Sequence, residues 1–352
     1  MRSIAFALFV ASCGLFPDLG ELSSSDAGQI ADAKNDAIIL PADGGTDVVI
    51  TPEASVSYVR TITIKNNASQ GLPKGYTIGV AFPESELQAA ITANKIRSDM
   101  NDLRLRGTAG ERDRLVDAPP LSRVVWFSLA SPISASATDT TYEITYGDPN
   151  AGSAPADGSN VFNFYDDFSG TSVNPQWMTQ GTVNVAGGML TLPKGGSGAL
   201  TALSQSPTST AEWRAQVTDP SSNPDGQGFY YWIGYQHTGD FVASDPWVVW
   251  ISRAPNFIGA EDKADGCLST CGNTPNAQTT AFRYFGIERQ AAQTIFSIDL
   301  VANYTTPATN DQALSPMIRN FLQTGDLIVD WYRSRARIYP EPTVTLGPEQ
   351  KQ

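Results

Sequence analysis

Short runs in which apolar and polar residues alternate recur along the chain from residue 58 onward. In the first half these runs are rich in β-branched residues and are bounded by turn residues: YVRTITI at 58–64, YTIGVAF at 76–82, DLRLRG at 102–107, RVVWFSLA at 123–130 and TTYEITYG at 140–147. A period of two residues puts alternate side chains on opposite faces of a strand, so the runs predict a β-sandwich. The glycine-free segment ESELQAAITANK at 84–95 predicts the one helix in this half.

Alternating runs continue through the second half and predict a second sandwich. They are TVNVAGGMLTL at 182–192, AEWRAQV at 211–217, GFYYWIGYQ at 228–236, WVVWISR at 247–253, RYFGIER at 283–289, TIFSIDLVA at 294–302 and GDLIVDWYRSRARIYPEPTVTLG at 325–347. The chain has 352 residues, which exceeds the usual extent of one hydrophobic core. We therefore expect an all-β fold made of two β-sandwich domains.

The first residues of the chain have the layout of an export signal. One basic residue precedes the apolar run Ile4–Val10, which is too short to span a bilayer and is followed by small residues. The sequence VASC at 10–13 resembles a bacterial lipobox. This resemblance implies a signal peptide at 1–12, a lipid anchor on Cys13 and, with glycine next in the chain, display at the outer membrane or cell surface. An ordinary secretory signal is the alternative.

Residues 13–45 are rich in Ser, Ala, Asp and Gly and predict a flexible acidic tether. Farther along, Cys267 and Cys271 lie close together in GCLSTCG. In an exported protein this spacing favours a disulfide. A zinc site is the alternative, but it would need two further ligands, and the chain contains a single histidine, His237.

The charge balance excludes one class of partner. The chain carries 23 Lys and Arg residues against 36 Asp and Glu residues, a formal net charge of −13, and has no basic block. Nucleic-acid binding requires cations that neutralise phosphates, so we expect no nucleic-acid partner and membrane contact only through the N-terminal anchor.

Several segments together resemble the domain of unknown function 2341 family: YVRTITIKN, RSDMNDLRLRG, VVWFSLA and YEITYGDPNA. The segment DGSNVFNFYDDFSG at 157–170 resembles the junction that such proteins show before a second domain, and the chain's last strands resemble those of concanavalin A-like, laminin G-like and family 16 glycoside hydrolase-like jelly rolls. The resemblance implies a first β-sandwich at 46–160 and a jelly roll at 161–348.

No catalytic residue can be assigned. The E-x-D-x-x-E run that family 16 hydrolases carry on one strand does not occur. The densest group of carboxylates, Glu261, Asp262 and Asp265, is expected in a solvated loop. His237 adjoins a Gly-Asp turn without a G-x-S-x-G motif, so we expect it at the surface.

Aromatic residues suggest a ligand face on the jelly roll. Alternation along residues 229–236 places Tyr230, Trp232 and Gln236 on one side of a strand, and we expect Trp250 of the next strand to join them. Such a face could stack on the apolar faces of sugar rings. The alternative is that these aromatic side chains belong to the core.

Calcium is the only cofactor that the resemblance implies. Similar jelly rolls hold a structural Ca²⁺ with an aspartate of the last strand and oxygens near the start of the domain, and oxygen ligands suit this ion. The corresponding residues are Asp330 with Asp166 or Asp167. The latter two could instead form hydrogen bonds at the start of a strand.

These observations favour a non-enzymatic, lipid-anchored bacterial surface protein whose jelly roll binds a carbohydrate or another extracellular ligand. Two other hypotheses remain. One is a polysaccharide-cleaving enzyme whose acid and base come from separate strands. The other is a purely structural or adhesive module.

Overall fold

We analysed the fold in a computed structural model. It describes residues 57–117, 123–201, 203–219, 231–237, 246–254, 257–263, 272–275, 280–307, 310–321 and 325–352. The predictions for Cys13, Cys267, Cys271 and Tyr230 therefore lie outside the described residues. The regular secondary structure of the described chain consists almost entirely of antiparallel strands, which confirms the all-β prediction.

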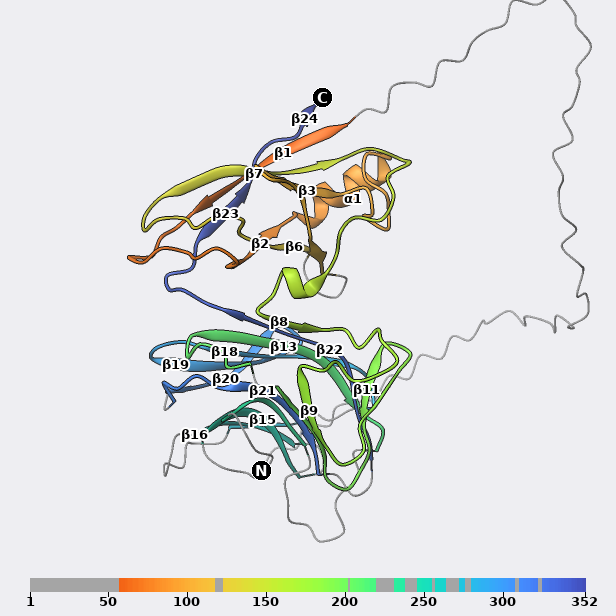
Figure 1. The fold of residues 1–352 in the computed structure, drawn as a ribbon, viewed down its shortest axis with the longest axis vertical. Coiled ribbons are helices and arrows are strands. Elements are labelled where there is room, and N and C mark those ends of the chain that lie inside the picture. The colour runs from red at the N-terminus through yellow and green to blue at the C-terminus, as the bar shows by residue number, and fades with distance from the viewer. Residues whose placement is uncertain are drawn as a thin grey trace, which may run out of the picture. The chain divides into compact units, whose positions relative to one another are not determined.

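The first sandwich pairs a six-stranded sheet with a three-stranded sheet (Figure 1). The larger sheet has the order β23-β1-β7-β3-β4, with β24 also paired to β1, and the smaller has the order β2-β6-β5. Their strands are β1 (Tyr58–Lys65), β2 (Thr77–Ala81), β3 (Arg104–Gly107), β4 (Gly110–Arg112), β5 (Leu115–Val116), β6 (Val124–Ser128), β7 (Thr138–Tyr146), β23 (Thr343–Leu346) and β24 (Gln350–Lys351).

The predicted helix forms as α1 (Glu84–Thr92) and packs on this sandwich. Leu87 and Ala90, three positions apart, are its buried residues and join the core of the first sandwich. The helix ends earlier than the sequence predicted, because Asn94 adopts a positive φ of 53°. A residue in this left-handed conformation terminates helices.

The C-terminal strands β23 and β24 belong to the first sandwich. Ile62 of β1 lies opposite Leu346, and Val59 lies opposite Gln350. The sequence placed the segment up to residue 348 in the jelly roll, and the structure corrects this for residues 343–348. The alternation in TVTL identifies a strand, but it does not specify which sheet the strand joins.

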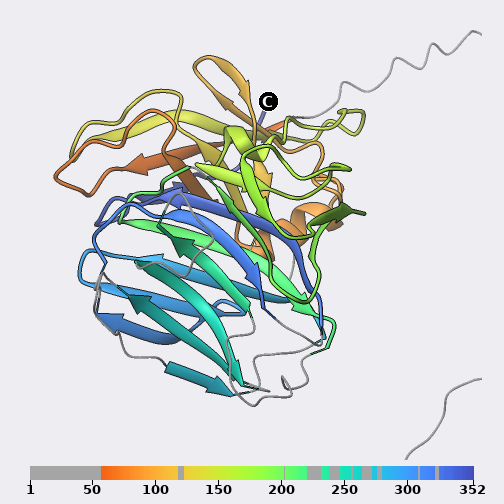
Figure 2. The same ribbon diagram turned by 60° about the horizontal axis from the view of Figure 1, so that its bottom comes forward.

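The second sandwich faces an eight-stranded sheet against a seven-stranded one (Figure 2). The orders are β10-β11-β22-β13-β18-β19-β20, with β8 paired to β22, and β17-β16-β15-β14-β21-β12-β9. The 3₁₀-helix η1 (Gly158–Asn160) precedes them. The strands are β8 (Phe164–Asp166), β9 (Trp177–Gln180), β10 (Asn184–Ala186), β11 (Met189–Leu192), β12 (Ser197–Thr201), β13 (Ser209–Val217), β14 (Tyr231–Gln236), β15 (Trp247–Ala254), β16 (Phe257–Lys263), β17 (Gly272–Pro275), β18 (Arg283–Arg289), β19 (Gln293–Ile298), β20 (Val301–Pro307), β21 (Ser315–Asn320) and β22 (Leu327–Ala336).

The core between these two sheets is rich in aromatic residues, and a hydrogen bond crosses it. The rings of Trp213 and Tyr332 stack with centroids 5.8 Å apart, and the Tyr332 hydroxyl donates to the carbonyl oxygen of Gly234 at 2.9 Å. Gly234 has a φ of 150°, and a Cβ there would lie 2.4 Å from the Val248 carbonyl oxygen. A glycine is therefore required at the centre of β14, the strand that carries the predicted ligand face.

Candidate functional site

The strand register separates the residues of the predicted ligand face. Trp232 lies opposite Ile251, whereas Trp250 lies opposite Ile233. Directly opposed residues share a face of a sheet, so Trp250 is on the core face and Trp232 on the outer face. Trp250 is fully buried and its Nε1 donates to the Gly286 carbonyl oxygen at 3.0 Å. The expectation that Trp250 joins Trp232 was therefore wrong.

Trp232 instead belongs to an aromatic cluster on the outer face of the seven-stranded sheet, separate from the main core. We call Trp232, Trp247, Phe321 and Arg319 the outer-face cluster. The ring centroids of Trp232 and Trp247 lie 4.9 Å apart, and those of Trp232 and Phe321 lie 5.7 Å apart. The Arg319 guanidinium lies 4.4 Å from the centroid of the Phe321 ring. Gln236, opposite Trp247, is on the same face and fully buried.

The members of this cluster differ in exposure. Trp232 and Trp247 are 2% and 6% exposed, and Phe321 is partly buried. A ligand would therefore meet the cluster at Phe321. Sequence reasoning missed Phe321 and Arg319, because SPMIRN of β21 has no regular alternation and was not recognised as a strand.

The three aspartates proposed for calcium are engaged elsewhere. Asp166 accepts hydrogen bonds from the Phe168 backbone N–H at 2.9 Å and the Trp177 indole at 2.8 Å, and burial raises its pKa against the effect of these bonds. Asp330 pairs with Arg214 at 2.5 Å. Among the described residues no group of three or more Asp, Glu, His or Cys side chains could hold a metal ion.

The exposed Asp167 caps its own turn through the Ser169 backbone N–H. The predicted donors therefore do not fit a calcium ion. Each of the three side chains takes part in local hydrogen bonds or an ion pair, and no shared ligand set forms.

The carboxylate-rich segment at 259–266 differs from the predicted solvated loop. Residues up to Lys263 belong to strand β16, and Asp262 is fully buried and accepts a hydrogen bond from Thr294 Oγ1 at 2.6 Å. Asp265 lies outside the described residues. His237 is exposed, in agreement with its sequence assignment.

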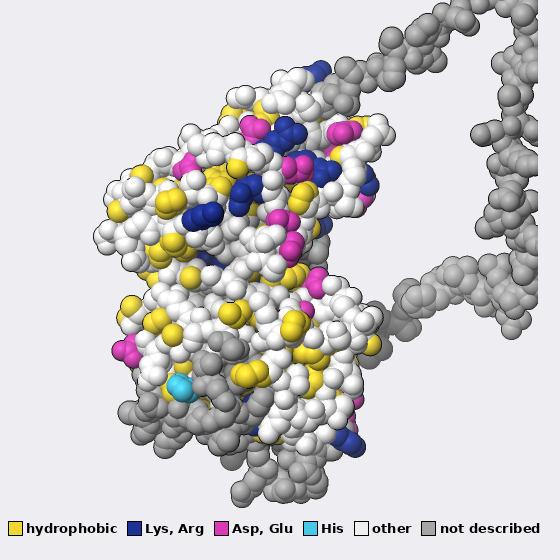
Figure 3. Space-filling view, viewed as in Figure 1, with side chains coloured by type: hydrophobic (Ala, Val, Ile, Leu, Met, Phe, Trp, Pro, Cys, Tyr) yellow, Lys and Arg dark blue, Asp and Glu magenta, His cyan; other side chains and the backbone are white. Residues whose placement is uncertain are grey.

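Two pockets flank Tyr146 in the first sandwich, and the sequence predicted neither. Basic and acidic side chains intermingle on this sandwich (Figure 3). The helix pocket, with a volume of about 530 Å³, lies between α1 and the end of the larger sheet and is lined by Arg60, Phe82, Ala89, Ala93, Lys95 and Glu349 among others. The strand pocket, with a volume of about 450 Å³, lies beside β3 and β7.

The charged residues that line the helix pocket form ion pairs with one another. Arg60 pairs with Glu86 at 2.7 Å and Lys95 pairs with Glu349. The Tyr146 hydroxyl donates to Glu349 at 2.8 Å. Burial and this neighbouring carboxylate raise the pKa of Tyr146 well above its usual value. Because its charged groups already satisfy one another, this pocket offers few free polar groups to a ligand.

A charged network joins the two sandwiches. Arg333 of β22 pairs with Asp117 of the first sandwich at 2.6 Å and with Glu212 of β13 at 2.7 Å. Asp117 also accepts from the Trp126 indole at 2.7 Å. Burial opposes the charge of Arg333, but the carboxylates of Glu212 and Asp117 outweigh this effect and hold its pKa above the usual value.

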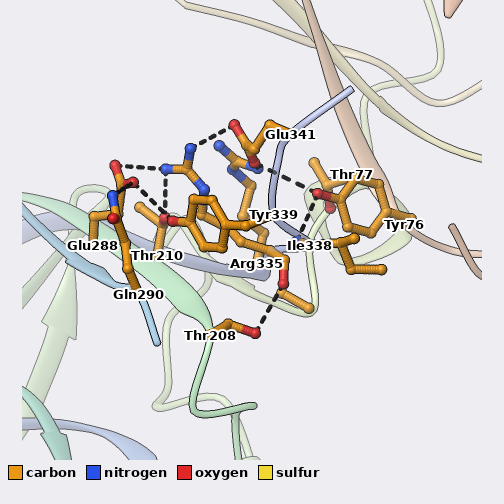
Figure 4. Close-up of polar contacts among 12 residues, drawn as sticks. Tyr76, Thr77, Thr208, Thr210, Glu288, Gln290, Arg335, Ile338, Tyr339 and Glu341 are labelled. Atoms are coloured by element: carbon orange, nitrogen blue, oxygen red, sulfur yellow. Dashed lines mark hydrogen bonds and ion pairs between the residues drawn. The ribbon is translucent and has the colours of Figure 1, made fainter. Parts of the chain in front are cut away.

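Glu341 extends the network (Figure 4). It lies between the guanidinium groups of Arg335, at 2.9 Å, and Arg337, and the Tyr76 hydroxyl of the first sandwich donates to it at 3.5 Å. Arg337 also pairs with Glu288 at 2.6 Å. Since every charge here has a partner, the network is best explained as a clamp between the sandwiches.

Comparison with known proteins gives one family match and several structural likenesses. The family described as "Domain of unknown function (DUF2341)" matches residues 120–180, from β6 into β9. None of the curated proteins matches the chain. In the described residues no helix is both long and apolar enough to cross a bilayer.

The similar solved structures are jelly-roll sandwich proteins. The laminarinase from Rhodothermus marinus is 14% identical, with a TM-score of 0.41 over 50% of this chain and 98% of its own. The beta-glucanase of Bacillus licheniformis is 12% identical, with a TM-score of 0.40 over 49% and 98%. A pseudo beta-1,3-glucanase of Mycobacterium tuberculosis is 13% identical, with a TM-score of 0.38 over 50% and 99%.

Proposed function

We propose that the chain is a non-enzymatic bacterial surface protein that binds carbohydrate at the outer face of the seven-stranded sheet. In this proposal the protein is exported and anchored through Cys13. The ligand meets the outer-face cluster at Phe321, with the buried Arg319, Trp232 and Trp247 behind it.

The observation that supports this proposal is the position of the cluster. Its rings turn away from the main core of the sandwich, and the Arg319 guanidinium lies against Phe321 at 4.4 Å. Aromatic rings offer an apolar surface to the C–H faces of sugars. The partly buried Phe321 therefore matches a ligand that presents an apolar face.

Phe321→Ala tests the site. Phe321 is partly buried, so its truncation should leave the fold intact and weaken glycan binding about tenfold, which is the loss of roughly 1.4 kcal/mol of contact. Leu203→Ala is the control, because Leu203 is an exposed apolar residue outside the cluster. Equal glycan affinity of both variants would exclude the proposed face.

An assay for new reducing ends separates binding from cleavage. Incubation of the bound polysaccharide with the protein should release none. If reducing ends accumulate, the alternative of a polysaccharide-cleaving enzyme replaces the binding proposal.

A further inference from the structure

The strand pocket lies on the outer face of the larger sheet of the first sandwich. We propose that it binds a neutral saccharide and so gives the chain a second carbohydrate site. Its volume of about 450 Å³ is in the range typical of small-molecule sites, roughly 300–1,000 Å³. The residues that carry the argument are Thr145, Arg104, Arg106, Glu111, Asp148 and Asn150.

Thr145 supplies a hydroxyl at the centre of this face. Within the sheet Thr145 lies opposite Val59 of strand β1 and opposite Arg104 of strand β3, and the residue is 6% exposed. Its Oγ1 makes no hydrogen bond with any residue that the structure describes. Because this hydroxyl lines the pocket and has no protein partner among the described residues, it can both donate to and accept from a hydroxyl group of a ligand.

The β3 side of the pocket is held rigidly. Arg104 donates to Glu111 Oε1 at 2.8 Å and to the Ser153 carbonyl oxygen at 3.1 Å, which fixes the plane of its guanidinium. Arg106 follows two residues later on the same face, and it is exposed. No carboxylate in the described part of the chain pairs with it, so its donors are available to a ligand.

The opposite side supplies acceptors as well as donors. Asp148 Oδ1 accepts from the Asn150 backbone N–H at 2.9 Å, which shapes the turn and leaves the Asn150 amide group exposed. An amide both donates and accepts, and a carboxylate accepts. Sugar hydroxyls also do both, so they match this mixed lining.

The charge of the lining favours a neutral ligand over an ionic one. Two guanidinium groups, Arg104 and Arg106, face three carboxylates, Asp102, Glu111 and Asp148. The two oxygens of Asp102 accept from the backbone N–H groups of Arg97 and Gly147, so this carboxylate is already satisfied. Neither sign of charge dominates, and an anionic or cationic ligand would gain little.

The test uses Thr145→Val, which keeps the shape of the side chain and removes the hydroxyl. Because the hydroxyl has no protein partner in the described residues, the melting temperature should stay the same or rise. Binding of neutral gluco-, galacto- and manno-oligosaccharides, measured by saturation-transfer NMR on the whole chain, should weaken roughly fivefold for those that occupy this pocket. Thr61→Val is the matched control, because Thr61 is exposed on β1 outside the pocket.

This site does not depend on the outer-face cluster, and the test keeps the two apart. Binding sensitive to Thr145→Val should persist in Phe321→Ala. The proposal is overturned if none of the neutral oligosaccharides binds, if Thr145→Val and Thr61→Val bind them equally, or if only oligogalacturonate binds, which would make the site specific for anions.

Discussion

Replacing Arg333 by methionine tests whether the charged network holds the two sandwiches together. The Arg333 side chain is 7% exposed and contacts both Asp117 oxygens, at 2.6 and 3.2 Å, and Glu212 at 2.7 Å. Methionine retains the apolar stem and removes the charge. Asp117, whose side chain is 10% exposed, would keep only the hydrogen bond from Trp126.

The expected loss of unfolding free energy in Arg333→Met follows from the carboxylates that lose their cationic partner. Breaking a buried ion pair by removing one partner costs about 3–5 kcal/mol. Glu212 is more exposed, at 28%, and still lies near Arg335, so most of this cost falls on Asp117. We therefore expect Arg333→Met to lower the free energy of unfolding by about 3–4 kcal/mol.

A double-mutant cycle of Arg333→Met and Asp117→Asn isolates the interaction energy between these two side chains. Asp117→Asn alone leaves Arg333 paired with Glu212 and should cost about 1–3 kcal/mol. Urea unfolding followed by tryptophan fluorescence gives the free energies for wild type, both single variants and the double variant. We expect the double variant to lose at least about 1 kcal/mol less than the sum of the singles. Single losses below about 1 kcal/mol that add independently would refute the clamp.

Three further predictions follow from the same contacts. Glu341→Gln should reduce the loss of unfolding free energy in acid. Burial opposes the charge of Glu341, but Arg335 and Arg337 hold its pKa below the usual 4.5. The stability that the charged Glu341 contributes is therefore present above pH 4.5 and disappears as the pH falls through the lower, folded-state pKa. Thermal unfolding of both proteins between neutral pH and pH 3 checks this, and parallel curves would contradict it. Deleting residues 343–352 removes β23 and β24 and should destabilise the first sandwich by about 2–4 kcal/mol, because Val344 and Leu346 pack on its core; proteolysis that leaves β1 and β7 as resistant as before would oppose this. Trp250→Ala should cost about 3–5 kcal/mol of unfolding free energy, since the fully buried ring meets Phe296 in the core, and a loss under about 1 kcal/mol would contradict its core position.

Local pattern was enough to locate most strands and the helix. The runs beginning at 58, 76 and 140 became β1, β2 and β7 with ends shifted by a few residues at most. Alternation between apolar and polar residues follows directly from the pleat of a strand when one face is buried. This alternation therefore identifies a strand even where the β-propensities of its residues are weak.

Pairing between strands could not be predicted in the same way. Trp232 and Trp250 each occupy the alternating positions expected within their own strands, but the register places them on opposite faces. Register depends on contacts between segments distant in sequence, and a shift of one residue reverses every side chain. The same cause hid the return of β23 to β1, since Ile62 and Leu346 are far apart in the chain.

The pockets were hidden for a related reason. Thr145 is one of several threonines in an alternating strand, and nothing in the sequence distinguishes it from Thr141. Its environment comes from β1 and β3 on either side and from the turn at Asp148 and Asn150. A site built from side chains of different segments has no local motif.

Carbohydrate binding by the purified chain is the most direct test of the account. A glycan array should identify at least one neutral glycan that binds the wild-type protein, with signal unchanged by a calcium chelator, because the proposed calcium ligands are engaged in other contacts. Absence of binding to every glycan by a protein that unfolds cooperatively would contradict the proposed function. Binding that is abolished by the chelator would contradict the structural account of Asp166 and Asp330.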